Sequence, residues 1–240
     1  MKIKLFTIPN LLTLGNLMCG CCAVLFLGML RPTLAFWLVV LAALFDFLDG
    51  FSARVLNKPS EIGVELDSLA DMVSFGLVPA AVMMRIYSYP STPFIFDWPS
   101  WLRTAGCFVP LLITAFSALR LAKFNVDDSQ HSEFCGVPTP ANALFCTSIA
   151  AIVSTGEVTL TGEVIVVLSL ISALLLICPI RMFSLKFRSF GWKDNEVRFI
   201  FLGLALCTIL LLRQYCVPAI IVLYIATSIV RNIVVKSRNA

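Results

Sequence analysis

Long apolar runs separated by short polar stretches dominate the chain. A bilayer core about 30 Å thick needs about 20 apolar residues of helix to cross it, and runs of that length recur throughout. The alternation of period two that marks a transmembrane β-strand is absent. The pattern therefore predicts an all-α, polytopic membrane helix bundle with about eight transmembrane helices, at residues 10–30, 33–53, 64–88, 104–124, 138–155, 163–180, 197–212 and 217–235.

Composition supports this class. The chain is 59% hydrophobic and 13% charged, whereas soluble domains carry about 25% charged residues. No soluble appendage interrupts the pattern, so residues 1–240 form one integral membrane domain. Lys2 and Lys4 precede the first apolar run, as in a signal peptide, but Pro9 and Asn10 open that run and no small-residue cleavage site follows it. We expect a retained helix there.

Basic residues indicate the orientation. With the N-terminus in the cytoplasm, fourteen of the 18 Lys and Arg residues fall in cytoplasmic segments. Cytoplasmic loops of membrane proteins carry this excess, so both termini are expected to be cytoplasmic, in a multi-pass protein of the cytoplasmic (inner) membrane. The net charge of +4 then reflects orientation and attraction to anionic headgroups, not binding to nucleic acid. The four remaining basic residues are Arg31, Arg85, Arg103 and Arg213.

Four aspartates interrupt the apolar pattern within residues 46–71. Asp46 and Asp49 are spaced i, i+3, and Asp67 and Asp71 are spaced i, i+4, so each pair lies on one face of a helix. A carboxylate at the centre of a membrane helix costs at least about 2.5 kcal/mol, so the group needs a compensating partner. The short loop 54–62 allows the two helices to fold back antiparallel and the pairs to converge. Four converging oxygen donors predict a site for Mg²⁺ or Mn²⁺.

Small residues and an arginine accompany the aspartates. Gly50, Ala53 and Gly63 lie near that face and leave room for a ligand or another backbone. Arg54 can bind a phosphate through two parallel hydrogen bonds. A metal cluster with an arginine and open space suits phosphoryl chemistry. Two other interpretations stay open on spacing alone: a pathway for protons or cations, and a structural salt-bridge cluster with Arg54.

The complete stretch reads D-x2-D-G-x2-A-R-x8-G-x3-D-x3-D, with every fixed position filled between residues 46 and 71. It resembles the signature of the CDP-alcohol phosphatidyltransferases. Further stretches resemble the phosphatidylserine synthases of that family, and Met72 stands where glycerophosphate-using members typically carry lysine. These stretches are PNLLTLGNLMCG, DSLADMVSFGLVPA, ALRLAKFNV and GVPTPANA. The resemblance implies a six-helix family core with two additional helices, commonly as a homodimer.

The resemblance also implies a mechanism. CDP-diacylglycerol would enter from the bilayer, with its pyrophosphate at the cytoplasmic end of the helices. Two metal ions, Mg²⁺ or Mn²⁺, would be held by Asp46, Asp49 and Asp67, with Asp71 as a bridging ligand. Asp71 is also the expected general base for the serine hydroxyl, which attacks the β-phosphorus and releases CMP. The expected contacts to the nucleotide and pyrophosphate are Gly50, Ala53, Arg54 and Gly63.

The serine site is expected around two cations and three polar residues. Arg120 and Lys123 could bind the serine carboxylate, although both could equally be anchors of the cytoplasmic side. Polar candidates for the pocket lining are Asn16, Asn125 and Thr139, of which Asn16 could instead bond a neighbouring helix. Two alternative functions stay open: the same chemistry with glycerol 3-phosphate or inositol phosphate as acceptor, and a cation- or proton-coupled transporter.

Overall fold

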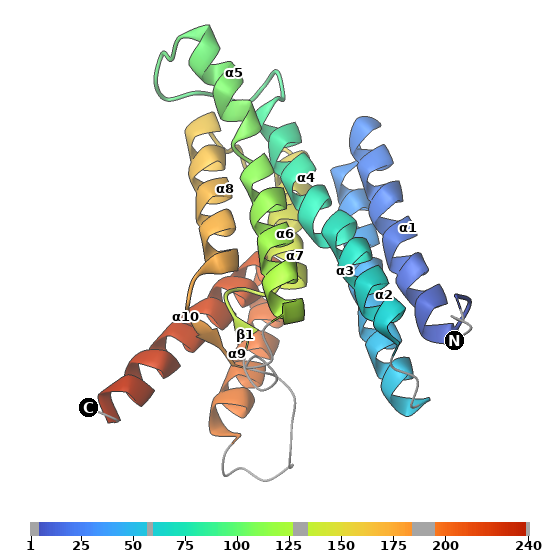
Figure 1. Ribbon diagram of the computed structural model, residues 1–240. Coiled ribbons are helices and arrows are strands. Elements are labelled where there is room, and N and C mark those ends of the chain that lie inside the picture. The colour runs from blue at the N-terminus through green and yellow to red at the C-terminus, as the bar shows by residue number, and fades with distance from the viewer. Residues whose placement is uncertain (1–4, 57–59, 127–133, 184–194, 239–240) are drawn as a thin grey trace.

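A computed structural model describes residues 5–56, 60–126, 134–183 and 195–238, which form a helix bundle (Figure 1). Its helical elements are, in chain order, α1 (Ile8–Gly28), α2 (Pro32–Val55), α3 (Glu61–Asp71), the π-helical segment η1 (Met72–Leu77), α4 (Val78–Tyr87), α5 (Ser100–Phe108), α6 (Leu111–Val126), α7 (Thr139–Ser154), α8 (Gly162–Ile177), α9 (Glu196–Leu212), the 3₁₀ turn η3 (Arg213–Tyr215) and α10 (Cys216–Arg238).

Each of the eight expected ranges contains helix, which confirms the all-α class. Five helical stretches are long and apolar enough to cross a membrane, at residues 8–28, 32–55, 61–87, 100–126 and 196–233. The last stretch combines α9 and α10, because the turn η3 joins them directly. Helices α7 and α8 are apolar but have only 16 residues each. The number of crossings and the side of the termini therefore stay predictions.

Side-chain caps begin the two helices that frame the site end of the bundle. Thr7 precedes α1, and its hydroxyl accepts a hydrogen bond from the Asn10 N–H at 3.3 Å. Ser60 precedes α3 and accepts from the Gly63 N–H at 3.1 Å. Both caps satisfy an N–H group that lacks a partner within its own helix. They fix where α1 and α3 start, one beside the other.

A short strand pair departs from the purely helical expectation. Strands β1 (Phe134–Cys135) and β2 (Arg181–Met182) pair antiparallel, with Phe134 opposite Met182. They join the segment that precedes α7 to the segment that follows α8. Strands of two residues are too short to give any alternation of polar and apolar positions, so the sequence pattern could not indicate them.

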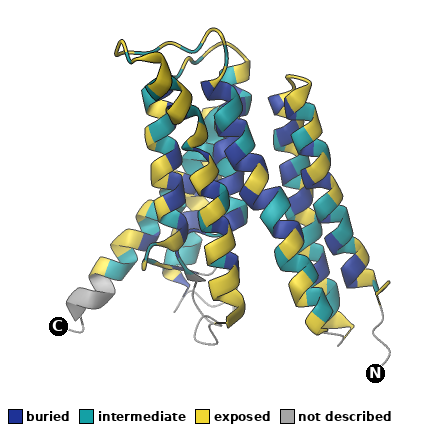
Figure 2. Cartoon of the chain, turned by 45° about the horizontal axis from the view of Figure 1, so that its top comes forward, coloured by how far each residue is buried: buried dark blue, intermediate teal, exposed yellow. Residues whose placement is uncertain are grey.

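The buried faces of the helices are lined largely by small side chains. Helix α1 packs along α2, and Ala23, Ala35 and Ala42 are fully buried there. Figure 2 shows buried positions between the helices and exposed ones on the outward faces. Close packing through small residues is typical of membrane helices, which gain no hydrophobic free energy from meeting one another. The start of α1, the α2–α3 connection and the end of α6 lie at one end of the bundle, opposite α5 (Figure 1).

Candidate active site

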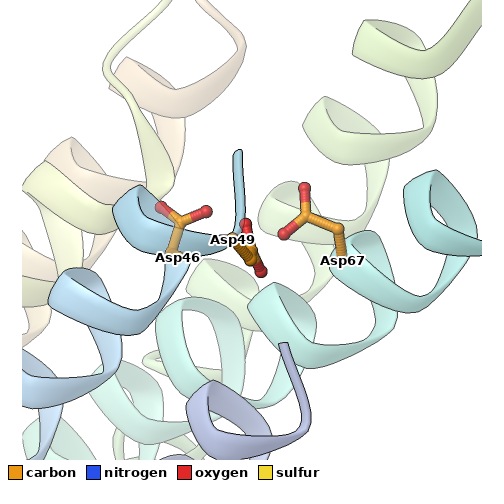
Figure 3. A group of neighbouring side chains, drawn as sticks. All are labelled: Asp46, Asp49 and Asp67. Atoms are coloured by element: carbon orange, nitrogen blue, oxygen red, sulfur yellow. The ribbon is translucent and has the colours of Figure 1, made fainter. Parts of the chain in front are cut away.

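Three carboxylates meet where α2 passes α3. One oxygen from each of Asp46, Asp49 and Asp67 lies within 4.8 Å of the others. Asp46 and Asp49 project from α2, one turn apart, and Asp67 faces them from α3 (Figure 3). Asp49 is buried, whereas the other two are half-buried. The expected fold-back of the two helices therefore brings these three aspartates together.

This carboxylate group has the donors of a divalent-cation site. All of them are oxygens, which Mg²⁺ and Mn²⁺ prefer, and the buried Oδ1 of Asp67 has no hydrogen-bond partner. Like charges this close are unfavourable without a compensating cation or proton. Among the described residues the one ion pair joins Arg103 to Asp97, at the end of the bundle that carries α5. No basic side chain of this part of the chain forms an ion pair with Asp46, Asp49 or Asp67.

Asp71 lies one turn beyond Asp67 on α3 and outside the close group of three. Its side chain is buried, with 7% of the residue exposed. The Asn16 Nδ2 group on α1 donates a hydrogen bond of 2.9 Å to Oδ1 of Asp71. Since that bond occupies one carboxylate oxygen, Asp71 is held in a fixed orientation. Its expected role as a further metal ligand stays a prediction.

Helix α1 also supplies a contact that the sequence analysis missed. The Thr13 hydroxyl lies 2.6 Å from Oδ2 of Asp49 and 3.0 Å from the Pro9 carbonyl oxygen. Asn10, Thr13 and Asn16 follow one another at intervals of three residues, so they form a polar stripe along an otherwise apolar helix. That stripe was the available signal, because polar side chains in a membrane helix seek partners on neighbouring helices.

The π-helical segment η1 begins directly after Asp71. Within it, the Ser74 hydroxyl donates a 2.9 Å hydrogen bond to the Asn16 carbonyl oxygen. Gly20 of α1 lies so close that an added Cβ would stand 2.9 Å from the Ser74 Cα atom. Segments of this kind occur mostly as single turns inside α-helices, often at functional sites. Through these two contacts, α1 packs directly against η1, the segment that follows Asp71.

A pocket of about 320 Å³ opens beside the aspartates. Asp46, Asp67 and Asp71 line one wall, and α6 with the start of α7 lines the other. The Nη1 group of Arg120 lies 3.5 Å from the Thr139 hydroxyl, while its buried Nε has no hydrogen-bond partner. The other expected residues that line this pocket are Gly50, Arg54 and Asn125. We call it the acceptor pocket, because Arg120, Asn125 and Thr139, which are expected at the serine site, line it.

A second pocket, of about 150 Å³, lies between α1, α2 and α3. We call it the nucleotide pocket, because Gly50, Ala53 and Gly63, which are expected to contact the nucleotide and pyrophosphate, line it. Gly50 and Asp67 line both pockets, so the two spaces meet at the carboxylates. A Cβ at Gly50 would meet no atom within 4 Å, so its neighbourhood is open. The remaining lining includes the expected residues Ala53 and Gly63 and the residues Pro9, Asn10, Thr13, Asp49, Ser60 and Val64.

Three expected site residues take positions that the sequence did not specify. Asn125 donates a 2.8 Å hydrogen bond to the Ser68 hydroxyl, which ties α6 to α3. Asn16 is fully buried behind Asp71 and lines neither pocket. Lys123 is exposed and also lines neither pocket, so the structure does not bring it to the site.

A sequence model of the CDP-alcohol phosphatidyltransferase family matches residues 6–180. This range contains all the residues of both pockets, and the chain belongs to that family. The match ends before α9 and α10 begin.

Curated relatives give a more particular likeness. The chain is 35% identical over 142 residues to the CDP-diacylglycerol–serine O-phosphatidyltransferase of Helicobacter pylori J99, covering 58% of this chain and 55% of the relative. It is 35% identical over 133 residues to the enzyme of that name from Bacillus subtilis, covering 55% and 69%. It is also 35% identical over 157 residues to the enzyme of that name from Mycobacterium tuberculosis H37Rv, covering 62% of this chain and 51% of the relative. The chain thus spans about half the length of the Helicobacter and Mycobacterium relatives.

Proposed function

We propose that this protein transfers a phosphatidyl group from CDP-diacylglycerol to the hydroxyl of L-serine, giving phosphatidylserine and CMP. The observation that carries the proposal is the carboxylate group at the junction of two pockets, with Asp71 lining the larger one. Membership of the CDP-alcohol phosphatidyltransferase family and the named relatives support the chemistry and the acceptor. A reaction between two substrates needs this arrangement, since both must reach the same reacting centre.

Asp46, Asp49 and Asp67 fit a divalent cation, Mg²⁺ or Mn²⁺, and we propose two ions with Asp71 as a further ligand. When bound, such ions neutralise the charge that develops on the phosphate oxygens. Thr13 holds Asp49 through its short contact to Oδ2, so this carboxylate is oriented before any ligand arrives. Partners of this kind support affinity because they fix the position of the donor oxygen.

Asp71 is the proposed general base. Asn16 occupies its Oδ1, which leaves Oδ2 to accept the proton of the serine hydroxyl as that oxygen attacks the β-phosphorus. Asp71 lines the acceptor pocket, so an alcohol bound there lies on the side of the base. The leaving CMP then departs from the other side of the carboxylate group, through the nucleotide pocket.

The nucleotide pocket suits the cytidine end of CDP-diacylglycerol. Gly50, Ala53 and Gly63 leave its walls without bulky side chains. Asn10 and Thr13 add polar groups from α1, which the sequence analysis did not assign to this end. Arg54 is exposed at the edge of the acceptor pocket, where we expect it to meet the pyrophosphate.

The acceptor pocket suits a small zwitterion such as serine. Arg120 has a free Nε, and with Thr139 and Asn125 it offers hydrogen bonds to a carboxylate and an amino group. Arg54 and Arg120 are the two basic residues of the described chain that line this pocket. A phosphorylated acceptor, such as glycerol 3-phosphate or inositol phosphate, would favour a denser basic cluster. We assign the exposed Lys123 to the headgroup layer instead.

We further propose that the protein lies in the cytoplasmic membrane as a homodimer with its site facing the cytoplasm. Charge bias supports the orientation. Helix α1 begins and α10 ends at the same end of the bundle as the carboxylates, which suits an even number of crossings (Figure 1).

The test is CMP release by the purified protein in detergent, with CDP-diacylglycerol and Mn²⁺ or Mg²⁺. Serine, glycerol 3-phosphate and inositol phosphate are compared as acceptors. We expect metal-dependent release with serine only. Release with a different acceptor would overturn the choice of serine and keep the chemistry. Cation flux in vesicles without CMP release would favour the transporter.

A further inference from the structure

Two helices follow the residues that the family model matches, and neither contributes a side chain to the two pockets. Helix α10 nevertheless packs against α7 and against β2, at the end of the bundle that holds the site. The contacts of one tyrosine, Tyr224 on α10, connect this helix to the acceptor pocket.

Tyr224 lies in a cluster of three aromatic rings. Its hydroxyl donates a 2.9 Å hydrogen bond to the carbonyl oxygen of Phe183, the residue after β2. The ring centroids of Tyr224 and Phe183 are 5.0 Å apart, and those of Tyr224 and Phe201 are 5.8 Å apart. Phe183 and Phe201 are buried, so the cluster is a packed joint between α9, α10 and the end of β2.

Strand β2 connects this aromatic cluster to the start of α7. It pairs with β1, and the Gly136 N–H donates a 2.9 Å hydrogen bond to the Ile180 carbonyl oxygen. Gly136 has a φ of +77°, and a Cβ there would lie 2.9 Å from the carbonyl carbon of Leu176, so the connection is tight and conformationally fixed. Thr139 begins α7 three residues later and is buried.

The same connection reaches Arg120. Arg120 in turn lies against Thr139 across the acceptor pocket. Tyr224 therefore bears on Thr139 through the strand pair, and on Arg120 through its contact with Thr139.

We infer that the α9–α10 hairpin is part of the acceptor site, and that Tyr224 is the positioning residue through which it aligns Arg120 and Thr139. This inference rests on the proposed function and names the wall of the acceptor pocket that the hairpin controls. Since Tyr224 lines neither pocket, its effect is on the geometry of residues that bind the acceptor, and not on CDP-diacylglycerol.

The test compares two matched Tyr→Phe variants of the full chain. Tyr224→Phe removes the hydroxyl and keeps the ring, while Tyr215→Phe makes the same change in η3, where the hydroxyl bonds Glu157 far from the site. We expect Tyr224→Phe to raise the KM for serine about three- to ten-fold, with kcat and the KM for CDP-diacylglycerol within about two-fold of the parent. Tyr215→Phe should leave all three constants unchanged.

An unchanged KM for serine in Tyr224→Phe, or an equal rise in both variants, would overturn the inference. If Tyr224→Phe does not fold, Asn232→Ala replaces it, because the Asn232 side chain of α10 donates a 2.7 Å hydrogen bond to the Arg181 carbonyl of β2. The same rise in KM is expected there. The parent protein separates the two proposals: if it uses another alcohol, serine fails as acceptor, and the variants are then compared on the KM for that alcohol.

Discussion

The Asn16 amide on α1 donates a 2.9 Å hydrogen bond to Oδ1 of Asp71 on α3, and both side chains are buried. The two residues are 55 positions apart in the chain, so the contact exists only because α1 docks against α3 and η1. It leaves the second oxygen of Asp71 outside this bond, and Asp71 lines the acceptor pocket. The first two predictions concern the two members of this pair.

Replacing Asp71 by asparagine should remove turnover and leave the fold intact. Asparagine keeps the shape of the side chain but cannot accept the hydroxyl proton, and a positioned base contributes about 100- to 10,000-fold to the rate. CMP release measures the loss. The matched control is Asp97→Asn at the far end of the bundle, where the parent rate is expected. Activity near the parent level in Asp71→Asn would refute the assignment of the base.

Asn16→Ala should lower kcat about ten-fold, less than Asp71→Asn does. Asp71 is still present in this variant, but it has lost the hydrogen bond from Asn16 that orients its carboxylate. A hydrogen bond to a charged group contributes more free energy than one between neutral groups. Single-turnover rates report on catalysis by Asp71, and the KM for serine reports on substrate binding. We expect only the former to change, because Asn16 does not line the acceptor pocket. A change in KM alone would place Asn16 in substrate binding and contradict its role behind Asp71.

Thr13→Val should weaken metal binding about ten-fold. Valine has nearly the same shape as threonine but lacks the hydroxyl that lies 2.6 Å from Asp49. Loss of a partner that orients a ligand typically costs 10- to 100-fold in metal affinity. The dependence of CMP release on Mn²⁺ concentration, and Mn²⁺ binding by calorimetry without substrates, both measure it. The matched control is Thr208→Val on α9, and equal Mn²⁺ affinities in the two variants would contradict the prediction.

Gly50→Leu should block the nucleotide. No atom lies within 4 Å of a Cβ at Gly50, so the larger side chain can fold into the open space that both pockets share. CMP affinity, measured by calorimetry, should fall below detection while the thermal stability stays near that of the parent. Gly203→Leu is the control, since Gly203 on α9 also has open space around it but lies outside both pockets. Unchanged CMP affinity in Gly50→Leu would mean that the nucleotide does not bind beside Gly50.

Gly20→Ala should destabilise the protein by about 1–3 kcal/mol, the usual cost of overpacking a tight contact. An added methyl group would stand 2.9 Å from the Ser74 Cα atom, and backbone cannot move aside as a flexible side chain can. Denaturant unfolding in detergent measures this change. Gly28→Ala, near the end of the same helix and with nothing within 4 Å, should be neutral or slightly stabilising. Equal stabilities would mean that α1 can shift away from η1.

Hydropathy predicted the helices, and the aspartate spacing placed each pair on one face, because both depend on the pattern along a single helix. The convergence of Asp46, Asp49 and Asp67 was predicted from the short connection at residues 54–62, which lets the two helices fold back. Contacts between helices were harder. Lys123 follows Arg120 by three residues and was expected beside it, yet rotation about the axis of α6 leaves Lys123 exposed. The polar stripe of α1 indicates that Thr13 faces another helix, but its contact with Asp49 depends on how α1 packs against α2.

The π-helical segment after Asp71 corresponds to one extra residue in a helix that is otherwise regular. The wide turn absorbs this extra residue, so that α4 keeps its orientation relative to α3. If the same residues formed an ordinary α-helix, α4 would be rotated by about 100°. The buried face of α4, with Val82, Met83 and Ile86, would then no longer lie in line with the aspartates of α3. The π-helical turn between Asp71 and Val78 is therefore itself a requirement of the site, independent of which apolar side chains fill the interval.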